Sequence, residues 1–225
     1  MKQDYYQETL AADKLKRCYE IAPLRIKQYL EAEIQYVLKK INEQSLVLEL
    51  GCGYGRVLAR LAERARFTVG IDTSYASLSL CQETMKDISN YALLNTTAIR
   101  TGLRDRSFDS VVCIQNGISA FHVDERALVR ESIRITKPGG TILFSSYADK
   151  FWQERLKWFQ IQADAGLLGE IDLKTSRDGI IVSKDGFTAR TVRPHDFEVL
   201  VSGFDVEATI TEVDGSSIFC EIKPH

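Results

Sequence analysis

Three glycines within five positions, Gly51, Gly53 and Gly55, form the part of this chain whose spacing most directly suggests chemistry. Glycine accepts a positive φ and leaves backbone N–H groups uncovered, so a nucleotide-like ligand can approach the main chain of such a loop. Glu49 precedes the loop, and its carboxylate would repel a pyrophosphate and attract an ammonium group. The pattern therefore favours a ligand that carries a positive charge and no phosphate.

A strand and a helix must hold this loop in place. The apolar run that ends at Leu50 predicts a strand over residues 46–50, and apolar residues at helical spacing predict a helix over residues 55–65. Strand, glycine loop and helix is the arrangement typical of nucleotide-binding α/β folds.

Strands and helices continue to alternate along the chain, which favours a parallel, doubly wound sheet. The further elements expected in this part are strand 67–71, helix 74–89, strand 91–98, strand 109–115, helix 124–135 and strand 140–146. Residues 1–44 predict amphipathic helices, and Pro23 is expected to start one of them.

The last third of the chain has a different pattern. The elements expected there are helix 149–165, short strands within 171–192, helix 194–202, and strands 204–213 and 216–222. The pair Asp214-Gly215 between the final two strands is a hairpin signal. The chain is therefore expected to end in a β-hairpin.

The segment E-L-G-C-G-Y-G at residues 49–55 resembles the first motif of the class I S-adenosylmethionine-dependent methyltransferases, E/D-x-G-x-G-x-G. The segments Ser-Phe-Asp at 107–109 and Lys-Pro-Gly-Gly at 137–140 are similar to two further patterns of that superfamily. The resemblance is strong over residues 45–147, moderate over the terminal hairpin and weak elsewhere. It implies S-adenosyl-L-methionine as the cofactor.

The resemblance also implies an architecture. We expect an α/β, Rossmann-like, doubly wound sheet of seven mostly parallel strands, with an antiparallel C-terminal hairpin. Residues 1–225 are expected to form a single methyltransferase domain. Within it, residues 1–44 are expected to form a helical cap, and residues 148–192 a small β-containing insertion that serves as a substrate lid.

The resemblance assigns cofactor contacts at the strand ends that follow the glycine loop. Asp72, at the carboxyl end of the second strand, can accept both ribose hydroxyls, although capping the next helix is an alternative role. An acidic residue often binds adenine where Thr97 stands here, so the Thr97 hydroxyl or the backbone of Ala98 and Ile99 must replace it. The expected cofactor-binding residues are Glu49, Gly51, Cys52, Gly53, Gly55, Asp72, Thr73, Thr97, Ala98, Ile99, Gln115 and Asn116.

The acceptor side of the site is less clearly marked. His122 is a candidate general base that only a hydroxyl acceptor would need, and a surface position for it is equally consistent with the sequence. An aromatic and cationic set near the N-terminus is expected to close over the cofactor or substrate, with helix packing as the alternative for the tyrosines. This set comprises Tyr5, Tyr6, Tyr19 and Arg25.

Composition restricts the class of protein. The chain has 225 residues and a net charge of −2, without a basic run, so binding to nucleic acid is not expected. Its five cysteines are scattered without C-x-x-C spacing, which indicates reduced thiols, no metal site and a cytoplasmic location. No apolar run approaches the ~20 residues of a membrane span. We expect a monomer or homodimer that acts on a small molecule.

The predicted activity is in-line methyl transfer from S-adenosylmethionine to a nitrogen or oxygen nucleophile of a small molecule. One alternative is a protein or nucleic-acid methyltransferase, and another is a sensor that binds the cofactor without transferring methyl. A third is a nicotinamide-dependent oxidoreductase, which is disfavoured because Arg56 replaces the last glycine of G-x-G-x-x-G.

Overall fold

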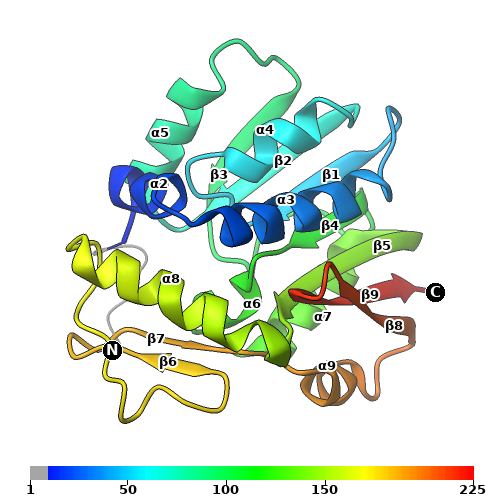
Figure 1. The fold of residues 1–225 in the computed structure, drawn as a ribbon. Helices are drawn as coiled ribbons and strands as arrows, with labels where there is room; N and C mark the ends of the chain where they lie inside the picture. The colour runs from blue at the N-terminus through cyan, green and yellow to red at the C-terminus, as the bar shows by residue number, and fades with distance from the viewer. Residues whose placement is uncertain (1–9) are drawn as a thin grey trace.

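A seven-stranded sheet crosses the molecule in the computed structural model, which describes residues 10–225 (Figure 1). Its strand order is β3-β2-β1-β4-β5-β9-β8. The strands of this sheet are β1 (Leu46–Leu50), β2 (Phe67–Asp72), β3 (Tyr91–Asn95), β4 (Phe108–Cys113), β5 (Thr136–Tyr147), β8 (Val206–Val213) and β9 (Ser217–Pro224). A smaller antiparallel pair consists of β6 (Ile180–Val182) and β7 (Thr188–Arg190).

The helices connect and cover these strands. They are α2 (Ala12–Glu20), α3 (Leu24–Leu38), α4 (Arg56–Ala62), α5 (Tyr75–Thr84), α6 (Gly117–Ala120), α7 (Glu125–Ile135), the 3-10 turn η1 (Asp149–Phe151), α8 (Trp152–Asp164) and α9 (Pro194–Val201). Among the described residues, no helix is long and apolar enough to cross a membrane.

Strand β1 lies at the centre of the parallel part of the sheet. It pairs in parallel with β2 on one side and with β4 on the other, so Leu48 lies beside both Val69 and Val111. Leu48 is fully buried, as expected for a strand covered on both faces. The strand order reverses between β1 and β4, and ligands of open α/β sheets bind outside the carboxyl ends at such a point.

Each face of the sheet packs against its own helices. Ile34 of α3 and Leu61 of α4 pack against Val47 and Phe219 on one face. On the other face, α7 and α9 contribute to the core cluster that contains Leu48. The result is the three-layer α/β arrangement that the alternation of elements predicted, with the strand that precedes the glycine loop in the middle layer.

The C-terminal hairpin is confirmed. Strand β9 lies antiparallel between β5 and β8, and Ile222 pairs with Ile142 of β5. Asp214 and Gly215 both adopt positive φ, of 56° and 65°, as a tight two-residue hairpin turn requires.

Several element boundaries differ from the prediction. β5 begins at Thr136, four residues before the expected start, because Thr136 already pairs with Phe108 before the register shifts. The Lys137–Gly140 segment therefore forms a bulge in the strand rather than a free turn. Helix α5 ends at Thr84, and the sequence did not predict the short helix α6.

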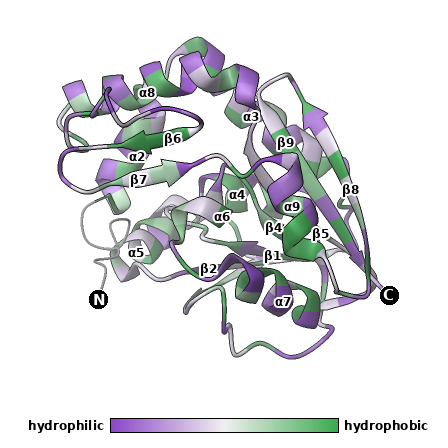
Figure 2. Ribbon diagram, turned by 90° about the horizontal axis from the view of Figure 1, so that it is seen from below, coloured by the Kyte–Doolittle hydropathy of each residue, from purple (hydrophilic) through white to green (hydrophobic). Residues whose placement is uncertain are grey.

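The segment within 148–192 has a small core of its own. Figures 1 and 2 show α8 running beside β6 and β7, where Phe159, Ile181 and Phe187 form a buried cluster. The fully buried Arg155 of α8 donates hydrogen bonds to the Gly179 and Ala189 carbonyls. This packing describes an ordered insertion, and its role as a substrate lid stays a prediction.

Candidate functional site

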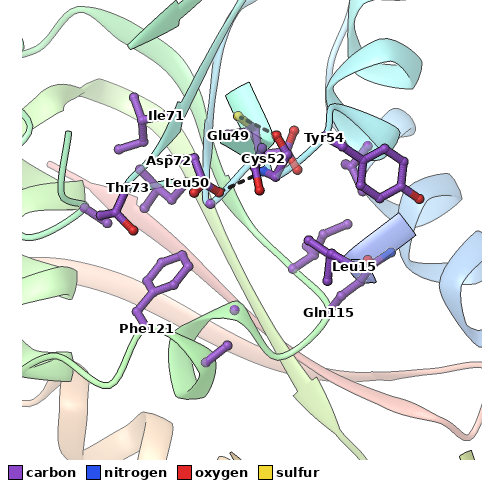
Figure 3. Close-up of a pocket in the computed structure, with 18 of the residues that line it drawn as sticks. Leu15, Glu49, Leu50, Cys52, Tyr54, Ile71, Asp72, Thr73, Gln115 and Phe121 are labelled. Carbon is purple, nitrogen blue, oxygen red and sulfur yellow. Dashed lines mark hydrogen bonds between the residues drawn. The ribbon is translucent and has the colours of Figure 1, made fainter. Parts of the chain in front are cut away.

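A pocket lies at the carboxyl ends of β1, β2, β3 and β4, next to the strand-order reversal (Figure 3). Leu15 and Tyr19 of α2 line it on the side of the N-terminal helices, and Phe121 and Val123 line it on the side of the segment after α6. Most of the predicted cofactor residues line this pocket: Glu49, Gly51, Cys52, Gly53, Asp72, Thr73, Thr97, Ala98 and Gln115.

The glycine loop has the geometry that its sequence predicted. Gly51, Gly53 and Gly55 adopt φ of 74°, 54° and 88°, values that favour glycine. A Cβ atom on Gly51 would lie 2.4 Å from the ring of Phe121, so any side chain there would displace the opposite wall of the pocket. Gly55 lies behind the pocket as the residue that precedes α4.

Asp72 connects the loop to the next helix. Its Oδ2 accepts a hydrogen bond from the Gly53 N–H at 2.9 Å, and its Oδ1 accepts one from the Ser74 N–H at 2.8 Å. Ser74, rather than Asp72, caps α5. Asp72 also lines the pocket, and a carboxylate can accept hydrogen bonds from hydroxyl groups.

The pocket is also lined by two ionisable side chains, Glu49 and Arg56. Glu49 is 5 % exposed, and its Oε2 has no hydrogen-bond partner among the described residues. Burial raises the pKa of Glu49 well above its ordinary value, and the nearby Arg56 opposes that rise. The Arg56 guanidinium lies 4.4 Å over the Tyr19 ring and donates to the Gln115 side chain, while its buried Nε lacks a partner in the described chain.

Arg56 was not among the predicted site residues. In the sequence, it served only as evidence against a dinucleotide-binding motif. One signal was present. Arg56 is the first residue of α4, where the partial positive charge of the helix N-terminus disfavours a cation. A cation retained at such a position indicates a partner beyond the helix.

The segment after β4 contributes less than predicted. Gln115 lines the pocket, whereas Asn116 is 4 % exposed, does not line it, and accepts a hydrogen bond from the Ser146 hydroxyl at 2.7 Å. Ile99 also lies outside the pocket lining. Glu33 of α3 was not among the predicted site residues. It does not line the pocket, but its carboxylate accepts a hydrogen bond from the backbone N–H of Gln115, which does.

The predicted acceptor-side residues are dispersed. His122 is exposed and is not among the pocket-lining residues, although both of its neighbours are. Tyr19 lines the pocket. Arg25 does not line it and forms an ion pair with Asp214, with an N–O distance of 2.6 Å. Tyr5 and Tyr6 lie outside the described residues. Within residues 10–225, no group of three or more His, Cys, Asp or Glu side chains is placed to hold a metal ion.

Comparison with known proteins identifies the fold and the loop together. Residues 47–140, which include the glycine loop and the first four pocket strands, match the family model of a methyltransferase domain. This match and the similar proteins described below support a class I S-adenosylmethionine-dependent methyltransferase. S-adenosylmethionine is the cofactor that these similarities imply.

Curated relatives of this methyltransferase include two O-methyltransferases. Malonyl-[acyl-carrier protein] O-methyltransferase of Marinomonas sp. (strain MWYL1) is 32% identical over 125 residues, covering 53% of this chain and 44% of that protein. Ubiquinone biosynthesis O-methyltransferase of Pseudomonas entomophila (strain L48) is 29% identical over 138 residues, covering 59% and 54%. The chain thus spans about half the length of the curated relatives it matches.

Solved structures share the methyltransferase fold over the whole chain. The PH0226 protein of Pyrococcus horikoshii OT3 covers 100% of both chains with a TM-score of 0.69 and 19% identity. N-methyltransferase NodS of Bradyrhizobium japonicum WM9, in complex with S-adenosyl-L-homocysteine, covers 99% of both chains with a TM-score of 0.63 and 15% identity. At these identities the likeness concerns the fold.

The unpartnered atoms of the methyltransferase pocket fit its cofactor. S-adenosylmethionine carries an amino-acid end with one ammonium and one carboxylate group. The buried Glu49 oxygen and the buried Arg56 nitrogen, both without partners in residues 10–225, are complementary to these two groups. Asp72, at the other side of the pocket, is complementary to a ribose.

Proposed function

We propose that this protein transfers the methyl group of S-adenosylmethionine to a nitrogen or oxygen nucleophile of a small molecule. The observation that carries the proposal is that two buried atoms of the pocket, Glu49 Oε2 and Arg56 Nε, have no partner among the described residues and match the zwitterionic end of the cofactor. The relative named as a ubiquinone biosynthesis O-methyltransferase supports a small acceptor, whereas the other O-methyltransferase is named for a malonyl group on an acyl-carrier protein. We propose a cytoplasmic location, because the thiols of the described residues are all free, and the expectation of a monomer or homodimer stays a prediction.

The pocket residues would hold the cofactor by complementary groups. Asp72 accepts the ribose hydroxyls, while Thr97 and the backbone of Ala98 face the base. Glu49 binds the ammonium group and Arg56 the carboxylate. Because burial disfavours a lone carboxylate at Glu49, an ammonium partner would stabilise its ionised form.

The methyl group that S-adenosylmethionine supplies is already activated by its positively charged sulfur. The chain therefore mainly orients the reactants and excludes water. Leu15 and Tyr19 of the helical cap cover the pocket, and we propose that the insertion within 148–192 closes the acceptor side as a lid. These two segments would set acceptor specificity.

The acceptor determines whether a base is needed. An amine must only lose its proton before it reacts, whereas a hydroxyl requires a general base. His122 is the proposed base for that second case, because it stands between the pocket-lining residues Phe121 and Val123. Because the His122 side chain is exposed, it would have to turn towards the pocket when the acceptor binds in order to reach the reacting atoms.

A labelling experiment tests this function. The purified protein, cofactor with a labelled methyl group and a metabolite extract should yield a labelled small molecule. Transfer of label to protein or nucleic acid in the same extract would replace the proposed acceptor class. Binding of S-adenosylhomocysteine without any labelled acceptor would favour a sensor, and absence of binding would reject the cofactor assignment.

A further inference from the structure

A buried carboxylate lies directly behind the pocket wall. Glu33 of α3 is fully buried, on a helix face otherwise formed by apolar residues such as Leu30, Ile34 and Val37. An ionisable group in such a position is costly unless its oxygens are hydrogen-bonded. Its retention on a core-facing helix indicates a specific task.

Three donors converge on this carboxylate. The Gln115 N–H donates to Oε2 at 2.6 Å and the Ser145 hydroxyl donates to Oε2 at 2.9 Å, while the Ser217 hydroxyl donates to Oε1 at 2.6 Å. The partners come from β5, β9 and the segment that follows β4. Glu33 thus joins α3 to three separate parts of the sheet.

The Gln115 contact supports an unusual backbone turn. Gln115 and the next residue, Asn116, adopt φ of 58° and 63°. Two consecutive residues other than glycine in the left-handed region are strained, and such a turn persists only where surrounding contacts hold it. Glu33 Oε2 accepts the N–H at the first residue of this turn.

The Gln115–Asn116 turn also supports the part of the pocket that contains Arg56. The Gln115 side chain accepts a hydrogen bond from the Arg56 guanidinium, which stacks on Tyr19. A continuous set of contacts therefore runs from Glu33 through Gln115 to Arg56. Gln115 lies on the side of the pocket away from Asp72 (Figure 3).

We propose that Glu33 is a positioning residue that sets the amino-acid end of the cofactor pocket by fixing the Gln115 backbone. The inference rests on the proposed function, because it assumes that Arg56 binds the cofactor carboxylate. Glu33 acts here by reach and geometry, and the negative charge itself is not required.

The two carboxylate oxygens explain why charge is dispensable. Oε2 faces an N–H that cannot reverse its polarity, whereas Oε1 faces the Ser217 hydroxyl, which can rotate to accept. A glutamine amide can place its oxygen at the Oε2 position and donate its NH2 group to Ser217. An aspartate keeps the charge, but its shorter side chain cannot reach Gln115 from the same backbone position.

The experiment compares Glu33→Gln with Glu33→Asp by calorimetry. Two ligands separate the ends of the pocket: S-adenosylhomocysteine has the amino-acid end, and 5′-methylthioadenosine lacks it. Glu33→Asp should bind S-adenosylhomocysteine about tenfold more weakly and 5′-methylthioadenosine with an affinity within about twofold of wild type. Glu33→Gln should bind both ligands as the wild type does.

Ser217→Ala is the matched control, because it removes the partner of the oxygen that faces away from Gln115. It should leave both affinities unchanged. Wild-type affinity for S-adenosylhomocysteine in Glu33→Asp would overturn the inference, as would an equal loss of both ligands, which indicates general damage. A greater loss of affinity for S-adenosylhomocysteine in Glu33→Gln than in Glu33→Asp would also overturn the inference, because it would show that the negative charge of Glu33 is required.

Thermal unfolding identifies any variant that fails to fold, and in that case Glu33→Gln and Ser145→Ala carry the test. Ser145→Ala removes the second acceptor of the Gln115 N–H, so it should weaken the binding of S-adenosylhomocysteine but not of 5′-methylthioadenosine. Wild-type affinity of Ser145→Ala for both ligands would reject the inference. A wild-type protein that binds neither ligand would reject the proposed function itself. The two failures are therefore distinguishable.

Discussion

The two ends of the pocket are built in different ways. The proposed ribose end depends on Asp72 and the glycine loop, which are joined by a hydrogen bond between residues only 19 positions apart. The amino-acid end depends on Glu33, Arg56 and Gln115, whose contacts span 82 and 59 positions. The first end is formed by two adjacent strands, and the second joins α3, α4 and the segment after β4, which are distant in the sequence.

This difference gives each end its own signature. Both S-adenosylhomocysteine and 5′-methylthioadenosine carry the ribose, so damage to the Asp72 end should affect both. Only S-adenosylhomocysteine reaches the Glu49–Arg56 end. Ligand pairs can therefore separate the two regions, and each of the following expectations applies that comparison.

The largest effect should come from the loop shared by both ends. Gly53→Val places a β-branched side chain at φ 54°, with its Cβ 3.1 Å from Leu15 Cδ2. Binding of both ligands should be abolished in calorimetry. Gly102→Val is the matched control, because Gly102 has φ 71° and open space around an added Cβ. Normal binding in Gly53→Val would exclude the loop as the site.

The next effect concerns stability and belongs to the buried end. Burial raises the pKa of Glu33 from 4.5 to about 7. The folded state therefore holds this proton more tightly than the unfolded state, and the free energy of unfolding falls as pH rises through that interval. The group should cost about 3 kcal/mol at pH 8 relative to pH 4.

Chemical unfolding of wild type and Glu33→Gln across pH 4–8 measures this cost. The variant cannot titrate at this position, so its stability relative to wild type should increase steadily with pH. A constant difference across the range would show that Glu33 titrates normally in the folded protein.

The local end gives the third expectation. Asp72→Ala removes the acceptor for ribose hydroxyls and for the Gly53 N–H. Both ligands should bind more weakly by roughly 1–3 kcal/mol. Asp87→Ala, an exposed carboxylate beyond α5, should change neither affinity. If only the affinity for S-adenosylhomocysteine fell, Asp72 would not lie at the part of the pocket that binds the ribose.

The same division explains what could be predicted from the sequence. The parallel strands, the terminal hairpin and the position of Asp72 in the pocket follow from apolar periodicity, glycine spacing and residues close to the loop. Glu33 and Arg56 were missed because periodicity treats one as a polar interruption of a helix face and the other as an ordinary helix residue. Their partners appear only when α3, α4 and β4 are brought together.

Backbone geometry was also beyond the sequence patterns. Gln115 and Asn116 carry no glycine or proline signal for their left-handed turn, so helix α6 after it was not predicted. The Lys137–Gly140 segment indicated a turn, but pairing of Thr136 with Phe108 drew it into β5. In both places contacts between distant strands, rather than local preference, determine the conformation.

The smallest expected effect distinguishes the two ends most sharply. Arg56→Leu keeps much of the aliphatic stem but removes the guanidinium that faces the pocket. S-adenosylhomocysteine should bind more weakly by about 1.5 kcal/mol, roughly tenfold, and 5′-methylthioadenosine should bind as before. Arg60→Leu, on the same helix but paired with Glu31 at the surface, should affect neither ligand. Because Arg56 receives its position from Gln115, a Glu33→Asp/Arg56→Leu double variant should lose less than the sum of the two single losses; full additivity would mean that Glu33 and Arg56 act independently.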